Sequence, residues 1–202
     1  MSSKYVGSKL RSEAKDRELG FAITGIEQKL KSEMIPTEKQ TWAHISHQGF
    51  QTPYEEFEEI FAHFDQAPRL WIDLGAGYGR LALALHESRP EDQFLGYELV
   101  AARAEEGNRI LIQQGSVHRI LTQDLTEASF ELPEADVYFI YDYGNQEDVA
   151  KTLEDLKKIA QRRQIDVIAR GRGITQVIFQ NHPWLYCNQD PVKGDHWILF
   201  RS

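Results

Sequence analysis

The stretch Leu70–Glu98, LWIDLGAGYGRLALALHESRPEDQFLGYE, decides the fold of this 202-residue chain. It opens with Leu70–Leu74, a short and mostly apolar run of the kind that a strand buried on both faces requires. Three glycines at alternate positions follow at once, and the leucines and alanines after them supply the apolar content of a helix. Gln93–Glu98 reads as a second strand, so the stretch predicts one βαβ unit with Glu98 at the carboxyl end of that strand.

The spacing of the glycines indicates a ligand at the turn. Glycine is required where the backbone adopts conformations forbidden to a residue with a Cβ atom, or where a ligand approaches the main chain closely. Asp73–Gly79 reads D-x-G-x-G-x-G, which differs from the G-x-G-x-x-G of dinucleotide-binding folds. An ionised Glu98 offers two acceptor oxygens, which match the two donors of a vicinal diol. The stretch therefore predicts a cofactor site, and the alternative is a glycine turn that serves packing alone.

This pattern resembles motif I of the class I S-adenosylmethionine-dependent methyltransferases. The resemblance implies S-adenosyl-L-methionine as the cofactor, with Glu98 binding both ribose hydroxyls. It also implies that Asp124 accepts a hydrogen bond from the adenine amino group and that the backbone N–H of Leu125 donates to the adenine ring. The predicted cofactor-binding residues are Thr52, Tyr54, Asp73, Gly75, Ala76, Gly77, Gly79, Glu98, Leu99, Asp124, Leu125 and Tyr141.

A short loop after the fourth predicted strand contains the predicted substrate-side residues. In a doubly wound sheet, ligands bind outside the carboxyl ends of the strands, near the switch in strand order. A sulfonium is attracted by a π-face or a carboxylate, and a lysine amine needs a group that helps it to lose a proton. We therefore predict Tyr141, Asp142 and Tyr143 as the catalytic residues. In the alternative, one or both tyrosines pack into the core and Asp142 caps the next helix.

Within this class, the chain is similar to two groups of small protein-lysine methyltransferases, those that modify ATP-synthase subunits and the non-SET histone enzymes. The likeness covers 51–202 and implies a protein lysine as the methyl acceptor. The matching pieces are Thr52-Pro53 before a helix, D-L-G-x-G-x-G-R-L at 73–81, Gly96–Leu99, Asp124-Leu125 and Ala169-Arg170. The loop Tyr141–Gly144 departs from both groups, and the absence of N-P-P-Y and D-P-P-Y disfavours base and glutamine amino nitrogens as acceptors.

The chain as a whole predicts an α/β fold. The resemblance implies a three-layer sandwich around a seven-stranded, mostly parallel sheet with strand order 3-2-1-4-5-7-6 and N-terminal helices. Trp184–Gln189 and His196–Arg201, around a turn at Asp190–Gly194, are predicted to form a C-terminal antiparallel hairpin. Residues 1–50 are predicted to be an N-terminal helical extension, and residues 51–202 the methyltransferase domain.

Two capping patterns predict helix starts before Leu70. Thr24 and Glu27 have the spacing of a capping box, and Thr52 with Pro53 and Glu55 predicts a helix that has Thr52 as its N-cap. The second helix has an apolar stripe and an acidic opposite face, which is either solvated or attracts a substrate with lysine or arginine. The acidic face consists of Glu55, Glu56, Glu58 and Glu59.

The sequence predicts no metal site. Thr37–His47 is expected to form a helix with His44 and His47 three residues apart, but no third His or Cys completes a ligand set. Cys187 is the single cysteine, which excludes an intramolecular disulfide and a zinc cluster.

The composition limits the binding partners and the cellular compartment that are expected. A net charge of −8 disfavours a nucleic-acid partner, because phosphate contacts come from clustered Lys and Arg, and it suits a basic acceptor. No apolar run approaches the roughly 18 residues of a membrane span, and the first residues lack a secretory signal. A cytoplasmic protein with no membrane contact is expected, and the oligomeric state stays open.

Three functional hypotheses follow. The leading one is a methyltransferase that acts on a protein lysine or on a small molecule. The second is a methyltransferase-like domain without catalysis, which binds a partner or senses the cofactor. The third, a nicotinamide-dependent oxidoreductase, is disfavoured by the spacing of Gly75, Gly77 and Gly79.

Overall fold

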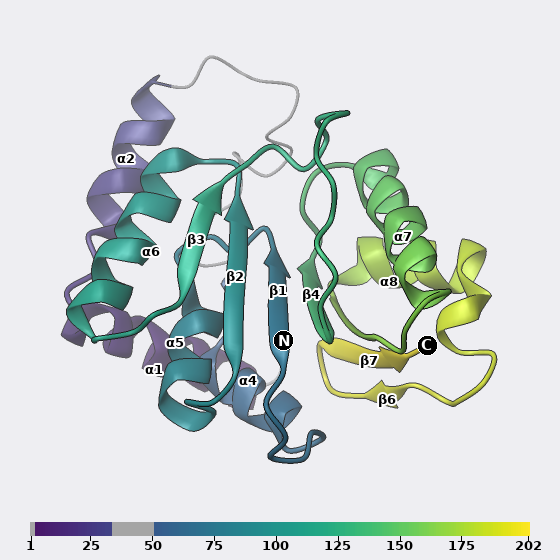
Figure 1. Cartoon of the computed structure of the whole chain (residues 1–202). Coiled ribbons are helices and arrows are strands. Elements are labelled where there is room, and N and C mark those ends of the chain that lie inside the picture. The colour runs from purple at the N-terminus through teal and green to yellow at the C-terminus, as the bar shows by residue number, and fades with distance from the viewer. Residues whose placement is uncertain (1–2, 34–50) are drawn as a thin grey trace.

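The computed structural model describes residues 3–33 and 51–202, and within them the strands form one seven-stranded sheet (Figure 1). The strands are β1 (Leu70–Leu74), β2 (Gln93–Glu98), β3 (Arg119–Thr122), β4 (Val137–Tyr141), β5 (Asp166–Arg170), β6 (Val192–Lys193) and β7 (Trp197–Arg201). Their order is β3-β2-β1-β4-β5-β7-β6. The first five strands run parallel, and β7 is antiparallel to β5 and β6. The structure confirms the predicted strand order.

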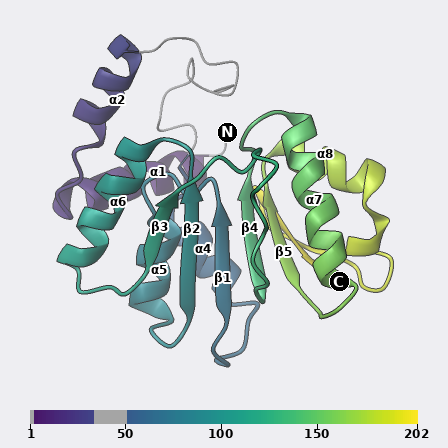
Figure 2. The ribbon, with the colours of Figure 1, turned by 45° about the horizontal axis from the view of Figure 1, so that its top comes forward.

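Helices cover both faces of this sheet. They are α1 (Ser3–Glu18), α2 (Ile23–Glu33), α4 (Tyr54–Phe61), α5 (Arg80–Ser88), α6 (Ala101–Gln113), α7 (Gln146–Ala160), α8 (Arg172–Asn181) and the 3-10 helix η1 (Pro183–Leu185). Trp71 of β1 packs in the core with α4, α5 and α6, whereas Ile72 packs in the core with α7 and α8 (Figures 1 and 2). Successive side chains of a strand point to opposite faces, so the three-layer architecture is confirmed. On the outside, α1 contacts α4 and α2 contacts α6.

The stretch Leu70–Glu98 folds as predicted. It forms β1, a turn, α5 and β2 in that order. Gly75, Gly77 and Gly79 of the turn have φ of 89°, 54° and 78°, a region that residues with a Cβ atom rarely adopt. This backbone conformation is the local reason for the alternating glycines.

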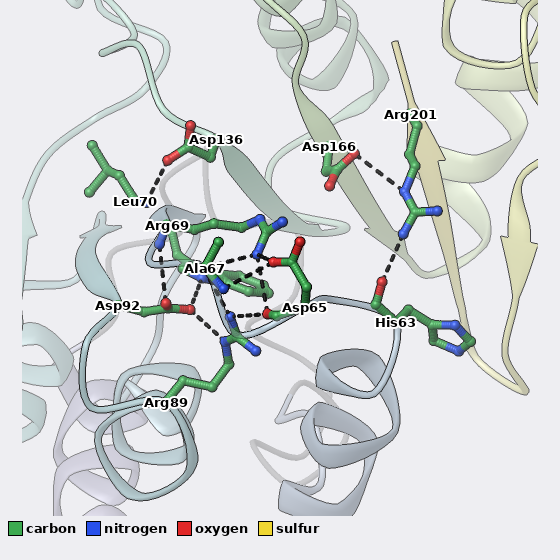
Figure 3. A network of polar contacts seen from close by, with 11 residues as sticks. His63, Asp65, Ala67, Arg69, Leu70, Arg89, Asp92, Asp136, Asp166 and Arg201 are labelled. Carbon is green, nitrogen blue, oxygen red and sulfur yellow. Dashed lines mark hydrogen bonds and ion pairs between the residues drawn. The ribbon is translucent and has the colours of Figure 1, made fainter.

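A polar network fixes the amino-terminal end of β1, at the opposite end of the strand from the glycine turn (Figure 3). The buried Asp92 carboxylate accepts hydrogen bonds from the Arg69 backbone N–H at 3.1 Å, from Trp71 Nε1 at 2.7 Å and from Arg89 Nε at 2.6 Å. Asp136 accepts from the Leu70 backbone N–H at 2.7 Å. These contacts hold the start of β1 in register with its neighbours.

The predicted N-cap of α4 is wrong. Pro53, not Thr52, is the N-cap residue, and its backbone is extended with φ −62° and ψ 147°. The backbone N–H of Tyr54, at the start of the helix, donates instead to Ser12 Oγ of α1 at 3.0 Å. A side chain from another helix therefore satisfies the donor that a local cap was expected to satisfy.

The capping box at the start of α2 is also wrong. The helix begins at Ile23, so Thr24 lies inside it, and the backbone N–H of Ile26 donates to Ala22 O at 3.1 Å. The Glu27 carboxylate binds the side chains of Tyr78 and Arg103 instead of its own helix terminus. The tertiary partners of Glu27 outcompete the local one.

The C-terminal hairpin is shorter than predicted. Trp184–Gln189 contains no strand, because Pro183 begins a 3-10 turn in which the backbone N–H groups of Tyr186 and Cys187 donate to Pro183 O. The hairpin partner of β7 is β6, which lies inside the segment predicted to be the turn. The helix α8, between β5 and η1, was not predicted from the sequence.

The acidic face of α4 is solvated only in part, because Glu58 and Glu59 are exposed whereas Glu56 is buried. Glu56 is buried and binds Arg170, Glu55 accepts from Arg11 Nε at 2.5 Å, and Glu59 accepts from Lys4 Nζ at 3.2 Å. Lys4 and Arg11 belong to α1, so the N-terminal helix covers much of this face.

Other predictions concern residues or properties that the structure treats only in part. Thr37–His47, with His44 and His47, lies outside the described residues. Among the residues described, no helix has the length and apolar character to cross a bilayer. In the same ranges, no three His, Cys, Asp or Glu side chains are grouped as metal ligands.

Candidate cofactor and active site

A cavity of about 200 Å³ lies at the carboxyl ends of β1, β2 and β4. Ligands bind at this edge in doubly wound sheets, where the strand order switches direction. The predicted site residues that line it are Thr52, Asp73, Gly75, Ala76, Gly77, Glu98, Leu99, Asp124, Leu125, Tyr141, Asp142 and Tyr143. Tyr54 and Gly79 lie outside this lining: Tyr54 is buried and donates to Asp16, and Gly79 begins α5 against Ile120.

The glycine turn opens onto the cavity at Gly77. A Cβ atom built on Gly77 would meet no atom within 4 Å, so the position borders open space. A Cβ atom on Gly75 would lie 3.1 Å from Cβ of Tyr143, so that glycine is also required by close packing. The turn is anchored to β2, because the backbone N–H groups of Gly75 and Ala76 both donate to Tyr97 O.

Asp73, the last but one residue of β1, presents a buried carboxyl to the cavity. Burial, and then the nearby Glu98 carboxylate, raise the pKa of Asp73 to about 8. Within the described residues, no hydrogen-bond donor partners this carboxyl. A buried carboxyl without a donor is costly to ionise, so Asp73 is suited to a ligand that brings a positive charge.

Glu98 is held by the backbone and remains able to accept. One carboxylate oxygen accepts from the Gly77 backbone N–H at 2.8 Å, and the other accepts from the Val100 backbone N–H at 3.0 Å. Burial raises the pKa of Glu98, and the Arg103 guanidinium and the two N–H donors offset part of that rise. Each carboxylate oxygen has two lone pairs, so each retains one acceptor position.

Asp124 and Leu125 line the cavity from the loop after β3, where the backbone N–H of Gln123 donates to Glu98 O at 2.9 Å. Asp124 Oδ1 accepts from the backbone N–H of Thr126 at 2.9 Å and from its Oγ1 at 2.6 Å, which fixes the loop. Leu125 is buried in the core with α7. The loop therefore places a carboxylate and an apolar residue side by side in the cavity wall.

The loop Tyr141–Tyr143 lines the cavity, and the prediction that Asp142 caps the next helix is wrong. All three residues line the cavity, but Asp142 also accepts from the backbone N–H groups of Gly173 at 3.2 Å and Ile174 at 2.7 Å. It thereby caps α8, while α7 has its own capping box from Asn145 and Asp148. Asp142 has a φ of 23°, the one positive value outside glycine among the described residues.

The two tyrosines of this loop are also held in place. The Tyr143 ring packs against the core that includes α7, and its hydroxyl is in contact with Thr152 Oγ1. Burial raises the pKa of Tyr143. The pKa of Tyr141 is likewise raised by burial, so both phenols stay protonated near neutral pH.

Sequence reasoning missed the contribution of the N-terminal helices. Glu27 of α2 lines the cavity with Tyr78 and Arg103, and Arg80 lines it while paired with the buried Asp16 of α1. The Arg80 guanidinium also donates to Thr52 O at 3.1 Å. No sequence signal links residues so far apart along the chain, although a buried arginine implies a carboxylate partner somewhere.

The cavity is acidic. Its carboxyl groups are supplied by Glu27, Asp73, Glu98, Asp124, Asp142 and Asp148, of which Asp73 is protonated at neutral pH, and its cationic side chains by Arg80 and Arg103. Both arginines are in ion pairs, with Asp16 and Glu27. The electrostatics favour a cationic ligand.

No protein-family model and no curated protein matches the chain. An RNA methyltransferase from Salinibacter ruber, solved with S-adenosyl-L-homocysteine, is 16% identical over 75% of this chain and 91% of its own, with a TM-score of 0.52. A putative S-adenosyl-L-methionine-dependent methyltransferase from Methanococcus maripaludis is 14% identical over 73% of this chain and 83% of its own, with a TM-score of 0.53. The mitomycin 7-O-methyltransferase MmcR is 19% identical over 73% of this chain and 52% of its own, with a TM-score of 0.51.

These likenesses define the fold. The chain has the fold of the class I S-adenosylmethionine-dependent methyltransferases, as the resemblance of motif I implied. At such low identities they do not identify an acceptor.

Proposed function

We propose that this protein is an S-adenosylmethionine-dependent methyltransferase whose acceptor is a lysine side chain of a protein. The observation that carries the proposal is the pair of buried carboxyl groups, Asp73 and Glu98, at the ends of two adjacent strands. Between them lies the turn at Gly77, which is open to the cavity.

The residues fit the proposed cofactor. Glu98 retains two acceptor positions, which suit the two ribose hydroxyls, and Asp73 suits the ammonium of the methionine portion. Asp124 and the Leu125 backbone, which line the same cavity, suit the adenine ring. When bound, S-adenosylmethionine supplies a methyl group on a positively charged sulfur, which an acidic cavity stabilises.

The acceptor side is formed by Tyr141, Asp142 and Tyr143. A lysine ammonium is attracted by the carboxylates of the lining, and it must lose its proton before the nitrogen can attack. In the proposal, Asp142 accepts a hydrogen bond from the amine and the tyrosine rings orient it. Because both tyrosines pack into fixed positions, the loop contributes mainly by orientation.

Two other functions stay open as outcomes of the test. A small-molecule acceptor is an alternative, since the mitomycin enzyme has the same fold. A methyltransferase-like domain that binds the cofactor without catalysis is the other. All three functions use the set Asp73, Gly75, Gly77 and Glu98 that lines the cavity, so the fate of the methyl group distinguishes them.

The experiment is incubation of the protein with host-cell extract and cofactor that is tritiated on the methyl group. The proposal expects label that protease digestion releases and nuclease digestion does not, and acid hydrolysis should yield methylated lysine. Label in small molecules alone would support the small-molecule acceptor. Cofactor binding without label in any fraction would support the silent domain.

A further inference from the structure

Polar contacts form a closed ring around the glycine turn. The Tyr78 hydroxyl donates to Glu27 Oε1 at 2.8 Å, and Glu27 accepts from Arg103 Nε at 2.8 Å and from Arg103 Nη2 at 3.1 Å. Arg103 Nη1 lies 3.9 Å from Glu98 Oε1, and Glu98 Oε2 accepts from Gly77, the neighbour of Tyr78. The ring therefore joins α2, α6, β2 and the turn itself.

Arg103 is able to block the free acceptor positions of Glu98. Its guanidinium can donate two parallel hydrogen bonds to one carboxylate, and those bonds would occupy the two acceptor positions that the backbone leaves open on Glu98. In the structure, the two donors of such a fork point to Glu27 instead. At 3.9 Å, the remaining contact with Glu98 is an ion pair without a hydrogen bond.

We infer that Glu27 is a positioning residue of the cofactor site, which holds Arg103 away from Glu98 so that Glu98 can accept from a vicinal diol. The inference rests on the proposed function, because the diol is the ribose of the cofactor. It assigns a role in binding to α2, which lies outside the residues 51–202 that the resemblance covers, and beside α6 in both views (Figures 1 and 2).

The geometry supports a role for Glu27 beyond anchoring α2. A separate contact anchors the start of that helix, because Glu106 accepts from the Ala22 backbone N–H at 2.6 Å and Arg109 Nη2 donates to Gly20 O at 2.7 Å. Glu27 itself is buried and lines the cavity, whereas Glu106 does not. Glu27 and Glu106 both lie between α2 and α6, and their roles can therefore be separated by substitution.

The test is calorimetric titration of S-adenosylhomocysteine into wild type, Glu27→Gln, Arg103→Met and the double variant. Glutamine keeps the volume of Glu27 but loses the charge that attracts Arg103. Glu27→Gln should raise Kd by about three- to tenfold, the effect of one or two hydrogen bonds. In the Arg103→Met background the same change should alter Kd by less than about twofold, because the competing guanidinium is absent.

Glu106→Gln is the matched control, because it changes the other carboxylate between α2 and α6 while leaving Arg103 untouched. It should bind S-adenosylhomocysteine as wild type does, and thermal melting establishes that every variant is folded. An unchanged Kd for Glu27→Gln overturns the inference, and so does an equal loss in the Arg103→Met background or in Glu106→Gln. Failure of wild type itself to bind overturns the proposed function as well, so the two failures are distinguishable.

Discussion

The Arg170 guanidinium carbon lies 4.1 Å from the centroid of the Tyr141 ring, and the two residues are opposite each other on β4 and β5. Arg170 is 2% exposed and donates from Nε and Nη2 to the Glu56 carboxylate at 3.0 Å and 2.8 Å. Nη2 also donates to the Tyr5 hydroxyl of α1 at 2.8 Å. A single buried arginine therefore links α1, α4 and β5 to a ring in the cavity wall.

Arg170→Met should destabilise the protein strongly, because it leaves the Glu56 charge buried without a partner. We expect a loss of about 3–5 kcal/mol in the free energy of unfolding, measured by urea denaturation. Glu56→Gln in the same chain should recover part of that loss. The control is Lys4→Met, which removes an exposed pair with Glu59 and should cost less than about 1 kcal/mol. Equal losses for Arg170→Met and Lys4→Met would contradict the buried-pair assignment.

Gly77→Ala and Gly115→Ala separate backbone strain from ligand binding. Both glycines have positive φ, 54° and 73°, and neither has an atom within 4 Å of a built Cβ. Each substitution should therefore cost about 1–2 kcal/mol of stability. Only Gly77 borders the cavity, so only Gly77→Ala should also weaken the binding of S-adenosylhomocysteine. Similar binding by the two variants would show that no ligand approaches the turn.

Asp73 predicts a pH dependence of stability. Because its pKa rises from an ordinary 3.8 to about 8 on folding, the folded state binds more protons between these values. The free energy of unfolding should fall as pH rises from 4 to 8, with a contribution of up to about 1.4 kcal/mol per pH unit from this group. Asp73→Asn should flatten that slope in denaturation curves measured without cofactor. An unaltered slope would mean that Asp73 is not a buried neutral acid.

His118 predicts the opposite pH dependence, a loss of stability at acid pH. It is buried, its Nε2 lacks a hydrogen-bond partner in the described residues, and burial lowers its pKa from 6.5 to about 4. The unfolded state binds more protons in this window, so stability should be lost as pH falls from 6.5 to 4. His118→Phe should reduce the loss, while substitution of the exposed His63 should not. Parallel acid unfolding curves for both variants and wild type would refute this source of acid sensitivity.

The local sequence pattern was sufficient to predict those parts of the fold that depend on residues close together in the sequence. The apolar run, the glycines and the second strand of Leu70–Glu98 have local causes, and β1 and β2 have the predicted bounds. The cofactor cavity also follows from the strand ends, because parallel strands that end at one edge bring Asp73, Glu98 and Tyr141 together.

Long-range partners account for the features that the sequence did not indicate. Ser12 replaces a local cap on Tyr54, and Glu27 binds residues that lie far along the chain. Trp184–Gln189 has high β propensity, but Leu185 is buried in the core with α8, and tertiary packing overrides propensity.

The most direct test of the central claim is calorimetric titration of S-adenosylhomocysteine, and separately of NAD, into wild type and Glu98→Ala. We expect wild type to bind S-adenosylhomocysteine and not NAD, and Glu98→Ala to weaken this binding by about 1–3 kcal/mol because the ribose contact is lost. Binding of NAD alone, or an affinity for S-adenosylhomocysteine that is the same in Glu98→Ala, would contradict it.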